Sequence, residues 1–102
     1  MAWQKVLNES DIDPTYPTPV DVGDKSIALY RLGEQVYATS NICTHEMAYL
    51  SDGYVENDCI ECPLHQAIFH IPTGELRAGP SCDNLKTFPV KLEGGEVYVD
   101  IE

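Results

Sequence analysis

The sequence predicts an all-β protein, an antiparallel sandwich or barrel that carries a small inserted metal-binding subdomain. Two hairpin patterns, one in each half of the chain, and the lack of a convincing helical period support this class. The segment between the hairpins is rich in Gly and Pro and contains two Cys-His pairs. With 102 residues, the chain suffices for one domain with a modest core.

The first half of the chain predicts one strand, one loop and one hairpin. Residues 3–7 form the expected first strand. The stretch 8–19 contains three prolines and predicts an ordered loop or a short 3₁₀ turn. Residues 26–32 and 35–39 flank Gly33-Glu34, which is the pattern of a two-residue hairpin turn.

The end of the chain predicts a second hairpin. Residues 85–92 and 96–101 flank a turn at Glu93-Gly94-Gly95, and the last strand alternates apolar and acidic residues. Between the hairpins, residues 41–80 predict short strands broken by six glycines and prolines. We therefore expect a single domain over 1–102, with a basal β part at about 1–40 and 81–102 and the metal-binding subdomain at about 41–80.

The most informative motif is Cys43-Thr44-His45, followed after sixteen residues by Cys62-Pro63-Leu64-His65. Thiolates suit iron–sulfur clusters, and imidazole suits iron as well as zinc. A 2Fe–2S cluster with two Cys on one iron and two His on the other needs one ligand of each kind from each loop. The motif matches this requirement.

Zinc is the competing interpretation of the four ligands. Structural Cys₂His₂ zinc sites commonly pair Cys with Cys and His with His, with two or more residues between them. Here each loop supplies one residue of each type, and only Thr44 separates Cys43 from His45. A zinc-stapled binding module remains the alternative, and metal analysis would separate the two.

The motif and the flanking pattern of strands resemble the Rieske family over nearly the whole chain. The resemblance implies a Rieske-like fold and one 2Fe–2S cluster, with Cys43 and Cys62 on one iron and His45 and His65 on the other. It also implies that Gly79-Pro80 belongs to a proline loop that covers the cluster.

High-potential respiratory Rieske proteins differ from this chain around the cluster. They carry a disulfide between the ligand loops, where Ala48 and Leu64 stand here. They also carry hydroxyl groups that donate to cluster sulfur, where this chain has Ala67 and Phe69, which cannot donate. Fewer donors stabilise the added electron less, so we expect a potential at the low end of the Rieske range.

The positions of six other residues near the motif suggest roles for them. Glu46, Met47 and Gln66 stand next to the ligand histidines and are candidates for a rim that faces partners, with an ordinary exposed loop as the alternative. Cys59 and Cys82 are expected to be buried free thiols. His70 follows an apolar pair, and a structural role is expected for it.

The net charge of −11 argues against nucleic acid and anionic membranes as partners. No Lys or Arg occurs between Arg31 and Arg77, a stretch that contains the whole motif and seven acidic residues. This pattern predicts a negative metal-binding end that meets basic partner surfaces, although a solvated acidic face is the simpler alternative.

The expected cellular location rests on two patterns that this sequence does not contain, a signal region and a membrane helix. The N-terminus shows no apolar signal region, and no run of residues approaches the ~20 apolar residues of a membrane helix. We expect a soluble cytoplasmic protein. In a reducing compartment, its four cysteines are expected to be ligands and thiols rather than disulfides.

The resemblance is strongest to the Rieske-type ferredoxin of bacterial aromatic-ring-hydroxylating dioxygenase systems. It implies an electron carrier rather than an enzyme, a monomer that takes single electrons from an NAD(P)H-dependent flavin reductase and delivers them to a terminal oxygenase. A small subunit of another redox enzyme, such as a nitrite reductase or an arsenite oxidase, is the alternative. An oxygenase in its own right is rejected, because only His70 remains for a mononuclear iron site.

Overall fold

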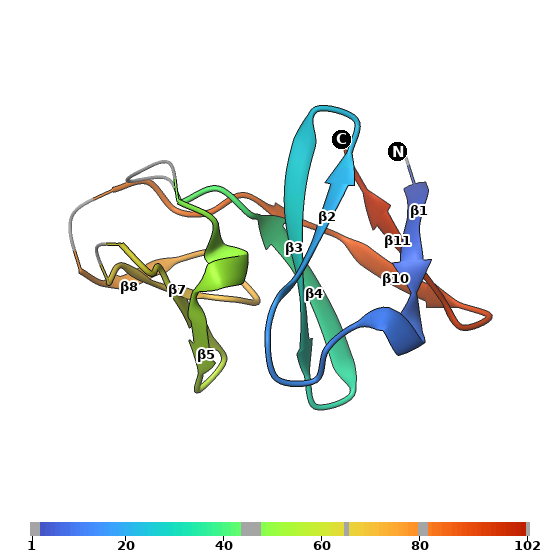
Figure 1. The fold of residues 1–102 in the computed structure, drawn as a ribbon, viewed down its shortest axis with the longest axis horizontal. Helices are drawn as coiled ribbons and strands as arrows, with labels where there is room; N and C mark the ends of the chain where they lie inside the picture. The colour runs from blue at the N-terminus through green and yellow to red at the C-terminus, as the bar shows by residue number, and fades with distance from the viewer. Residues whose placement is uncertain (1–2, 44–47, 65, 80–81, 102) are drawn as a thin grey trace.

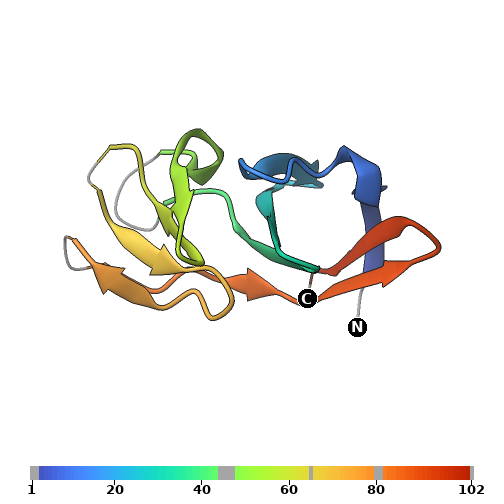
Figure 2. The same ribbon diagram turned by 90° about the horizontal axis from the view of Figure 1, so that it is seen from below.

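A computed structural model of the chain describes residues 3–43, 48–64, 66–79 and 82–101. The molecule is elongated, with extents of 39 × 26 × 19 Å. One end holds the two sheets of what we call the basal lobe, and the other end holds a third sheet, as Figures 1 and 2 show. We call this second part, the described residues within 41–79, the inserted lobe.

All three sheets are antiparallel. The first basal sheet has the order β1 (Trp3–Asn8), β11 (Glu96–Asp100) and β10 (Val90–Glu93). The second has the order β2 (Thr18–Val22), β3 (Lys25–Leu32), β4 (Gln35–Ser40) and β9 (Thr87–Phe88). The sheet of the inserted lobe has the order β5 (Tyr54–Glu56), β6 (Cys59–Glu61), β7 (Ile68–His70) and β8 (Leu76–Ala78).

Short 3₁₀ turns are the helical elements of the described chain. They are η1 (Glu9–Asp11) and η2 (Leu50–Asp52). The first lies inside the stretch for which a loop or 3₁₀ turn was predicted. Within the described residues, no helix has the length and apolarity needed to cross a membrane. The predicted all-β class is therefore confirmed.

Both predicted hairpins form. Strands β3 and β4 pair from Leu32 and Gln35 outward, and Gly33 has a φ of 66° at the turn between them. Strands β10 and β11 pair on either side of Gly94 and Gly95, whose φ values are 59° and 78°. Positive φ at both central residues is the mark of a type I′ turn, which matches the twist of the two strands.

Two predictions about the strands were wrong. Strand β2 was not predicted, because Pro19 argued for a loop; β2 is an edge strand, where a missing N–H costs no ladder hydrogen bond. The predicted strand at 85–92 is two strands, β9 and β10, which belong to different sheets. Pro89 stands between them and cannot donate to either ladder.

Strand β3 connects the cores of the two lobes. Its residues Ile27 and Leu29 pack in the basal core, while Ala28 and Tyr30 pack in the core of the inserted lobe, and all four are buried. Side chains alternate between the two faces of a strand, so one strand supplies both cores. This arrangement fixes the position of the inserted lobe against the basal lobe.

A buried hydrogen-bond chain reinforces this contact. The Thr39 hydroxyl donates to the Ser40 carbonyl at 2.9 Å, so it accepts from the Tyr30 hydroxyl at 2.8 Å. Burial of the ring raises the pKa of Tyr30 above its ordinary value, against the smaller opposing effect of the hydrogen bond to Thr39. The Tyr30 hydroxyl therefore stays protonated and donates to Thr39, while its ring packs in the core of the inserted lobe.

Candidate metal centre

The two cysteines of the motif begin two loops that close in the same way. The Cys43 N–H donates to the Ala48 carbonyl at 2.9 Å, and the Cys62 N–H donates to the Ala67 carbonyl at 2.8 Å. Each loop also has a stem, since Ile42 pairs with Tyr49 and β6 pairs with β7. Two equivalent strand-to-loop corners thus hold the two cysteines.

Both cysteines are buried in the core of the inserted lobe. Cys43 is 3% exposed and Cys62 is fully buried, and they share this core with Leu50, Ile60 and Phe69. Two thiols at equivalent corners of one core form half of the donor set that the sequence predicted. The other predicted ligands, His45 and His65, lie outside the described residues, as do Glu46, Met47 and Pro80.

The structure describes three predicted neighbours of the cluster at the second loop, Gln66, Ala67 and Phe69. Gln66 is exposed and adopts a φ of 58°, and its N–H donates to the Cys62 carbonyl at 3.2 Å. Ala67 and Phe69 are fully buried in the core that holds the cysteines. Among the described residues alone, no three His, Cys, Asp or Glu side chains converge as metal ligands do.

Gly79 packs directly against the second loop. Its φ is 100°, and a Cβ atom at this position would stand 2.7 Å from Ala67 Cα and 3.0 Å from the Gln66 carbonyl oxygen. Only a residue without a side chain allows this approach. The chain directly after β8 is therefore in close contact with the loop that begins at Cys62.

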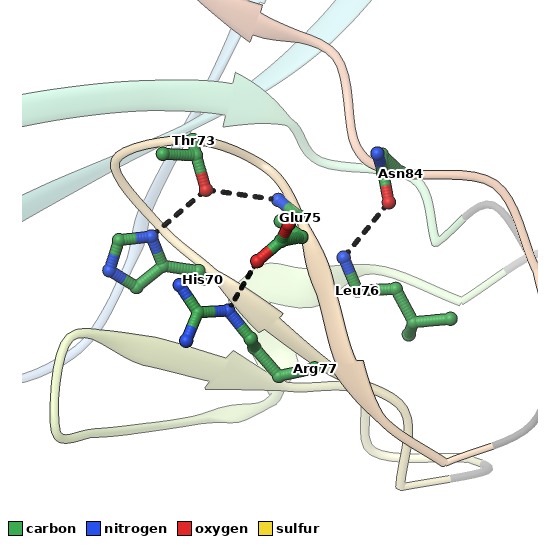
Figure 3. A network of polar contacts seen from close by, with 6 residues as sticks. All are labelled: His70, Thr73, Glu75, Leu76, Arg77 and Asn84. Atoms are coloured by element: carbon green, nitrogen blue, oxygen red, sulfur yellow. Dashed lines mark hydrogen bonds and ion pairs between the residues drawn. The ribbon is translucent and has the colours of Figure 1, made fainter.

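The segment after the predicted proline loop is tied back to the β7–β8 turn. The Leu76 N–H donates to Asn84 Oδ1 at 3.0 Å (Figure 3), and the Leu85 N–H donates to the Gly74 carbonyl at 2.8 Å. A Cβ on Gly74 would stand 2.3 Å from the Leu85 carbonyl oxygen. Both flanks of the predicted loop are therefore anchored.

His70 takes part in a turn, in agreement with the structural role expected for it. Its Nδ1 lies 2.9 Å from Thr73 Oγ1, which also accepts from the Glu75 N–H at 3.3 Å (Figure 3). The Glu75 carboxylate in turn pairs with Arg77 at 2.8 Å. These contacts stabilise the connection between β7 and β8.

The expectation that Cys59 and Cys82 are buried was wrong. Both are free thiols that are only half-buried. In β6, Ile60 faces the core, so strand alternation turns Cys59 toward the outer face of the sheet. Cys82 packs against the core of the inserted lobe but is only partly buried.

The inserted lobe carries a net negative charge, and so does the remainder of the chain. Asp52, Glu56 and Asp58 are exposed, and the single basic residue of 41–80, Arg77, pairs with Glu75. The remainder of the chain carries eleven of the seventeen acidic residues and is also negative overall. Both parts of the chain are therefore acidic, and the prediction of a negative metal-binding end stays a prediction.

Two features of the centre were missed at the level of sequence. The first is the closure of each loop by an alanine, for which the signal was an Ala five residues after each motif Cys. The second is the exposure of two apolar side chains in and next to the loops, since Leu64 is 60% exposed and Tyr49 is 52% exposed. Exposure of these side chains depends on tertiary packing.

The described half of the site fits a 2Fe–2S cluster. A bound Rieske cluster supplies one-electron transfer, at a potential that histidine ligation raises. The chain contributes two equivalent corners with buried thiols, and it lines them with Ala67 and Phe69, which exclude water. An all-β domain that presents two such Cys-x-His and Cys-x-x-His loops is a mixed-ligand iron–sulfur domain.

Comparisons with known proteins agree with this class. A model of the Rieske [2Fe-2S] domain matches residues 2–89. The ferredoxin component of the naphthalene 1,2-dioxygenase system of Pseudomonas putida is 43% identical over 99 residues, which cover 97% of this chain and 95% of that protein. The ferredoxin of carbazole 1,9a-dioxygenase from Nocardioides aromaticivorans IC177 superimposes with a TM-score of 0.92 at 33% identity, with 100% of both chains covered.

A further solved structure is a complex of reduced oxygenase and oxidised ferredoxin in carbazole 1,9a-dioxygenase. A chain in it matches with a TM-score of 0.88 at 42% identity and covers 95% of this chain and 100% of its own length. The present chain belongs to the Rieske [2Fe-2S] domain family. It carries one Rieske 2Fe–2S cluster and serves electron transport, which confirms the predicted cofactor and role.

Proposed function

We propose that this protein takes single electrons from an NAD(P)H-dependent flavin reductase and passes them to a terminal ring-hydroxylating oxygenase. The observation that carries the proposal is similarity over nearly the full length to ferredoxin components of dioxygenase systems. A similar chain has been solved together with its oxygenase, which supports the second partner. We further propose that the protein works as a monomer in the cytoplasm.

In this proposal Cys43 and Cys62 bind one iron, and His45 and His65 bind the other. The burial of both thiols at equivalent loop closures supports the cysteine pair. The residues within about 41–80 then form the cluster-binding subdomain, and about 1–40 with 81–102 form the basal part. The separate cores of the two lobes support that division.

Docking of partners at the cluster end is supported by the exposed side chains beside the loops. Leu64 lies between Cys62 and His65 in the sequence and is 60% exposed, and Tyr49 follows the first loop. Small exposed apolar contacts on a protein of net negative charge suit short-lived complexes, in which charge guides the encounter and affinity stays low. An electron shuttle needs such contacts because it must leave each partner in turn.

A single experiment tests the function. The protein is reduced anaerobically with dithionite, freed of excess reductant, and mixed with an oxidised terminal oxygenase of the naphthalene dioxygenase type. We expect a rhombic EPR signal with an average g below that of an all-cysteine 2Fe–2S protein, and on mixing we expect the spectrum of this protein to be replaced stoichiometrically by that of the reduced oxygenase. A colourless, zinc-containing protein, or a cluster that the oxygenase cannot reoxidise, would contradict the proposal.

The environment of Ala67 predicts that the potential can be raised by one hydroxyl group. In the variant Ala67→Ser, the new donor lies beside the second loop and is expected to hydrogen-bond a cluster sulfur more strongly after reduction. A preference of ~1.4 kcal/mol for the reduced state corresponds to a rise of about 60 mV in a one-electron midpoint potential. Redox titration followed by EPR measures it, and an unchanged or lower potential would contradict the placement of Ala67.

A further inference from the structure

Asn41 lies at the base of the first cysteine loop and makes four hydrogen bonds there. Its backbone N–H donates to the Ser26 carbonyl at 2.9 Å, and its carbonyl accepts from the Leu50 N–H at 2.7 Å. Its side chain donates through Nδ2 to Ser26 Oγ at 3.1 Å and accepts through Oδ1 from the Ser51 N–H at 2.8 Å. The residue is only 2% exposed.

The orientation of the Asn41 amide is fixed by its partners. A backbone N–H can only donate, so the atom that faces Ser51 must be the carbonyl oxygen, and the NH₂ group must face Ser26. The two ends of one side chain thus bind different lobes. Ser26 belongs to β3 of the basal lobe, whereas Ser51 belongs to η2 of the inserted lobe.

The elements that Asn41 joins are those that hold Cys43. Ile42 pairs with Tyr49 directly after Asn41, and the Cys43 N–H then donates to Ala48. Leu50, whose N–H binds the Asn41 carbonyl, is fully buried in the same core as Cys43. The position of this loop relative to the basal lobe therefore depends on Asn41.

We propose that Asn41 is a positioning residue for the first cluster ligand loop: its amide links Ser26 of the basal lobe to Ser51 of the inserted lobe and thereby fixes the place of Cys43. This inference rests on the proposed role of Cys43 as a ligand.

A groove beside Asn41 explains why loss of its side chain should affect the loop more than the stability of the whole fold. A groove of about 490 Å³ is lined by residues that include Ser26, Asn41, Ile42, Tyr49 and Ser51. If the Asn41 side chain is shortened, water from the groove can satisfy the Ser26 hydroxyl and the Ser51 N–H. The backbone hydrogen bonds of Asn41 to Ser26 and Leu50 remain, but the side-chain connection between Ser26 and Ser51 is lost, so the loop is held less firmly without a large loss of stability.

The test compares Asn41→Ala with Val97→Ala, which shortens a fully buried side chain in the basal core, away from the loop. Two rates are measured: loss of the cluster to a chelator, and amide hydrogen exchange at Ser51 in protein with and without the cluster. For Asn41→Ala we expect about tenfold faster loss, equivalent to ~1.4 kcal/mol, faster exchange at Ser51, and a shifted EPR spectrum. For Val97→Ala we expect a lower melting temperature with an unchanged EPR spectrum and Ser51 exchange.

A double-mutant cycle with Ser26→Ala tests the link itself. Alone, Ser26→Ala removes the acceptor of Asn41 Nδ2 and should accelerate cluster loss by about threefold. Combined with Asn41→Ala, it should add almost nothing, because both changes cut the same connection. Fully additive effects would overturn the proposal, as would equal cluster loss in Asn41→Ala and Val97→Ala variants at matched stability.

The outcomes distinguish this proposal from the proposed function. Wild-type protein without a mixed-ligand EPR signal would refute the function. The Ser51 amide in cluster-free protein would still report whether Asn41 links the lobes, since that bond lies within the chain.

Discussion

Cys62→Ser is expected to abolish the cluster. The thiol of Cys62 is fully buried at the start of the second loop, so water cannot reach this position and act as a ligand in its place. A serine hydroxyl has nearly the same shape but is not ionised at neutral pH, and the thiolate is the form that binds iron. Iron and acid-labile sulfide should fall from about two of each per chain to near zero.

Cys59→Ser is the matched control for this experiment. Cys59 lies three residues earlier on the outer face of β6 and is a half-buried free thiol. Its replacement should leave the iron content and the visible spectrum unchanged. If both variants lose the cluster, the effect comes from the thiol content of the inserted lobe rather than from ligation by Cys62; if neither does, Cys62 is not a ligand.

Gly79→Ala is expected to cause a large loss of stability from a single methyl group. The new Cβ would stand 2.7 Å from Ala67 Cα, which is backbone and cannot swing aside, and φ at Gly79 is 100°. Backbone strain and the forced displacement together should cost about 3 kcal/mol or more. In a domain of this size, the melting temperature should fall by roughly 12–24 °C or more.

Gly94→Ala separates the strain from the clash. Gly94 has a φ of 59°, but an added Cβ would meet nothing within 4 Å. This variant should lose only about 1 kcal/mol, or roughly 4–8 °C. Thermal unfolding by circular dichroism measures both variants, and EPR of Gly79→Ala should also change because the second ligand loop must move. Equal losses for both variants would show that the approach of Gly79 to Ala67 is not tight.

The sequence could predict the elements that depend on local patterns. Alternation of apolar residues and the turn glycines identified the hairpins β3–β4 and β10–β11, because strand period and positive φ are local properties. Strand β2 was missed since the same local reasoning cannot tell an edge strand from a loop at Pro19. The division of 85–92 between two sheets likewise depends on partners distant in the sequence.

The candidate site shows the same limit. The spacing alone predicted both Cys-His pairs as ligands, because the type of each donor and the length of each loop can be read directly from the sequence. Cys59 was wrongly predicted to be buried. Tertiary packing decides which face of β6 meets the core, and that face carries Ile60 rather than Cys59. Nor does anything local mark Asn41, since its partners lie 15 and 10 residues away.

The sequence by itself therefore determined the family, the all-β class, the cofactor and its candidate ligands, because these follow from residue types at fixed spacings. Only the tertiary structure decided how the two lobes are joined. Strand β3 sends alternate side chains into two cores, Gly79 fits against Ala67, and Asn41 binds Ser26 and Ser51 across the lobes. These contacts join residues far apart in the chain, and their geometry exists only once the sheets have packed.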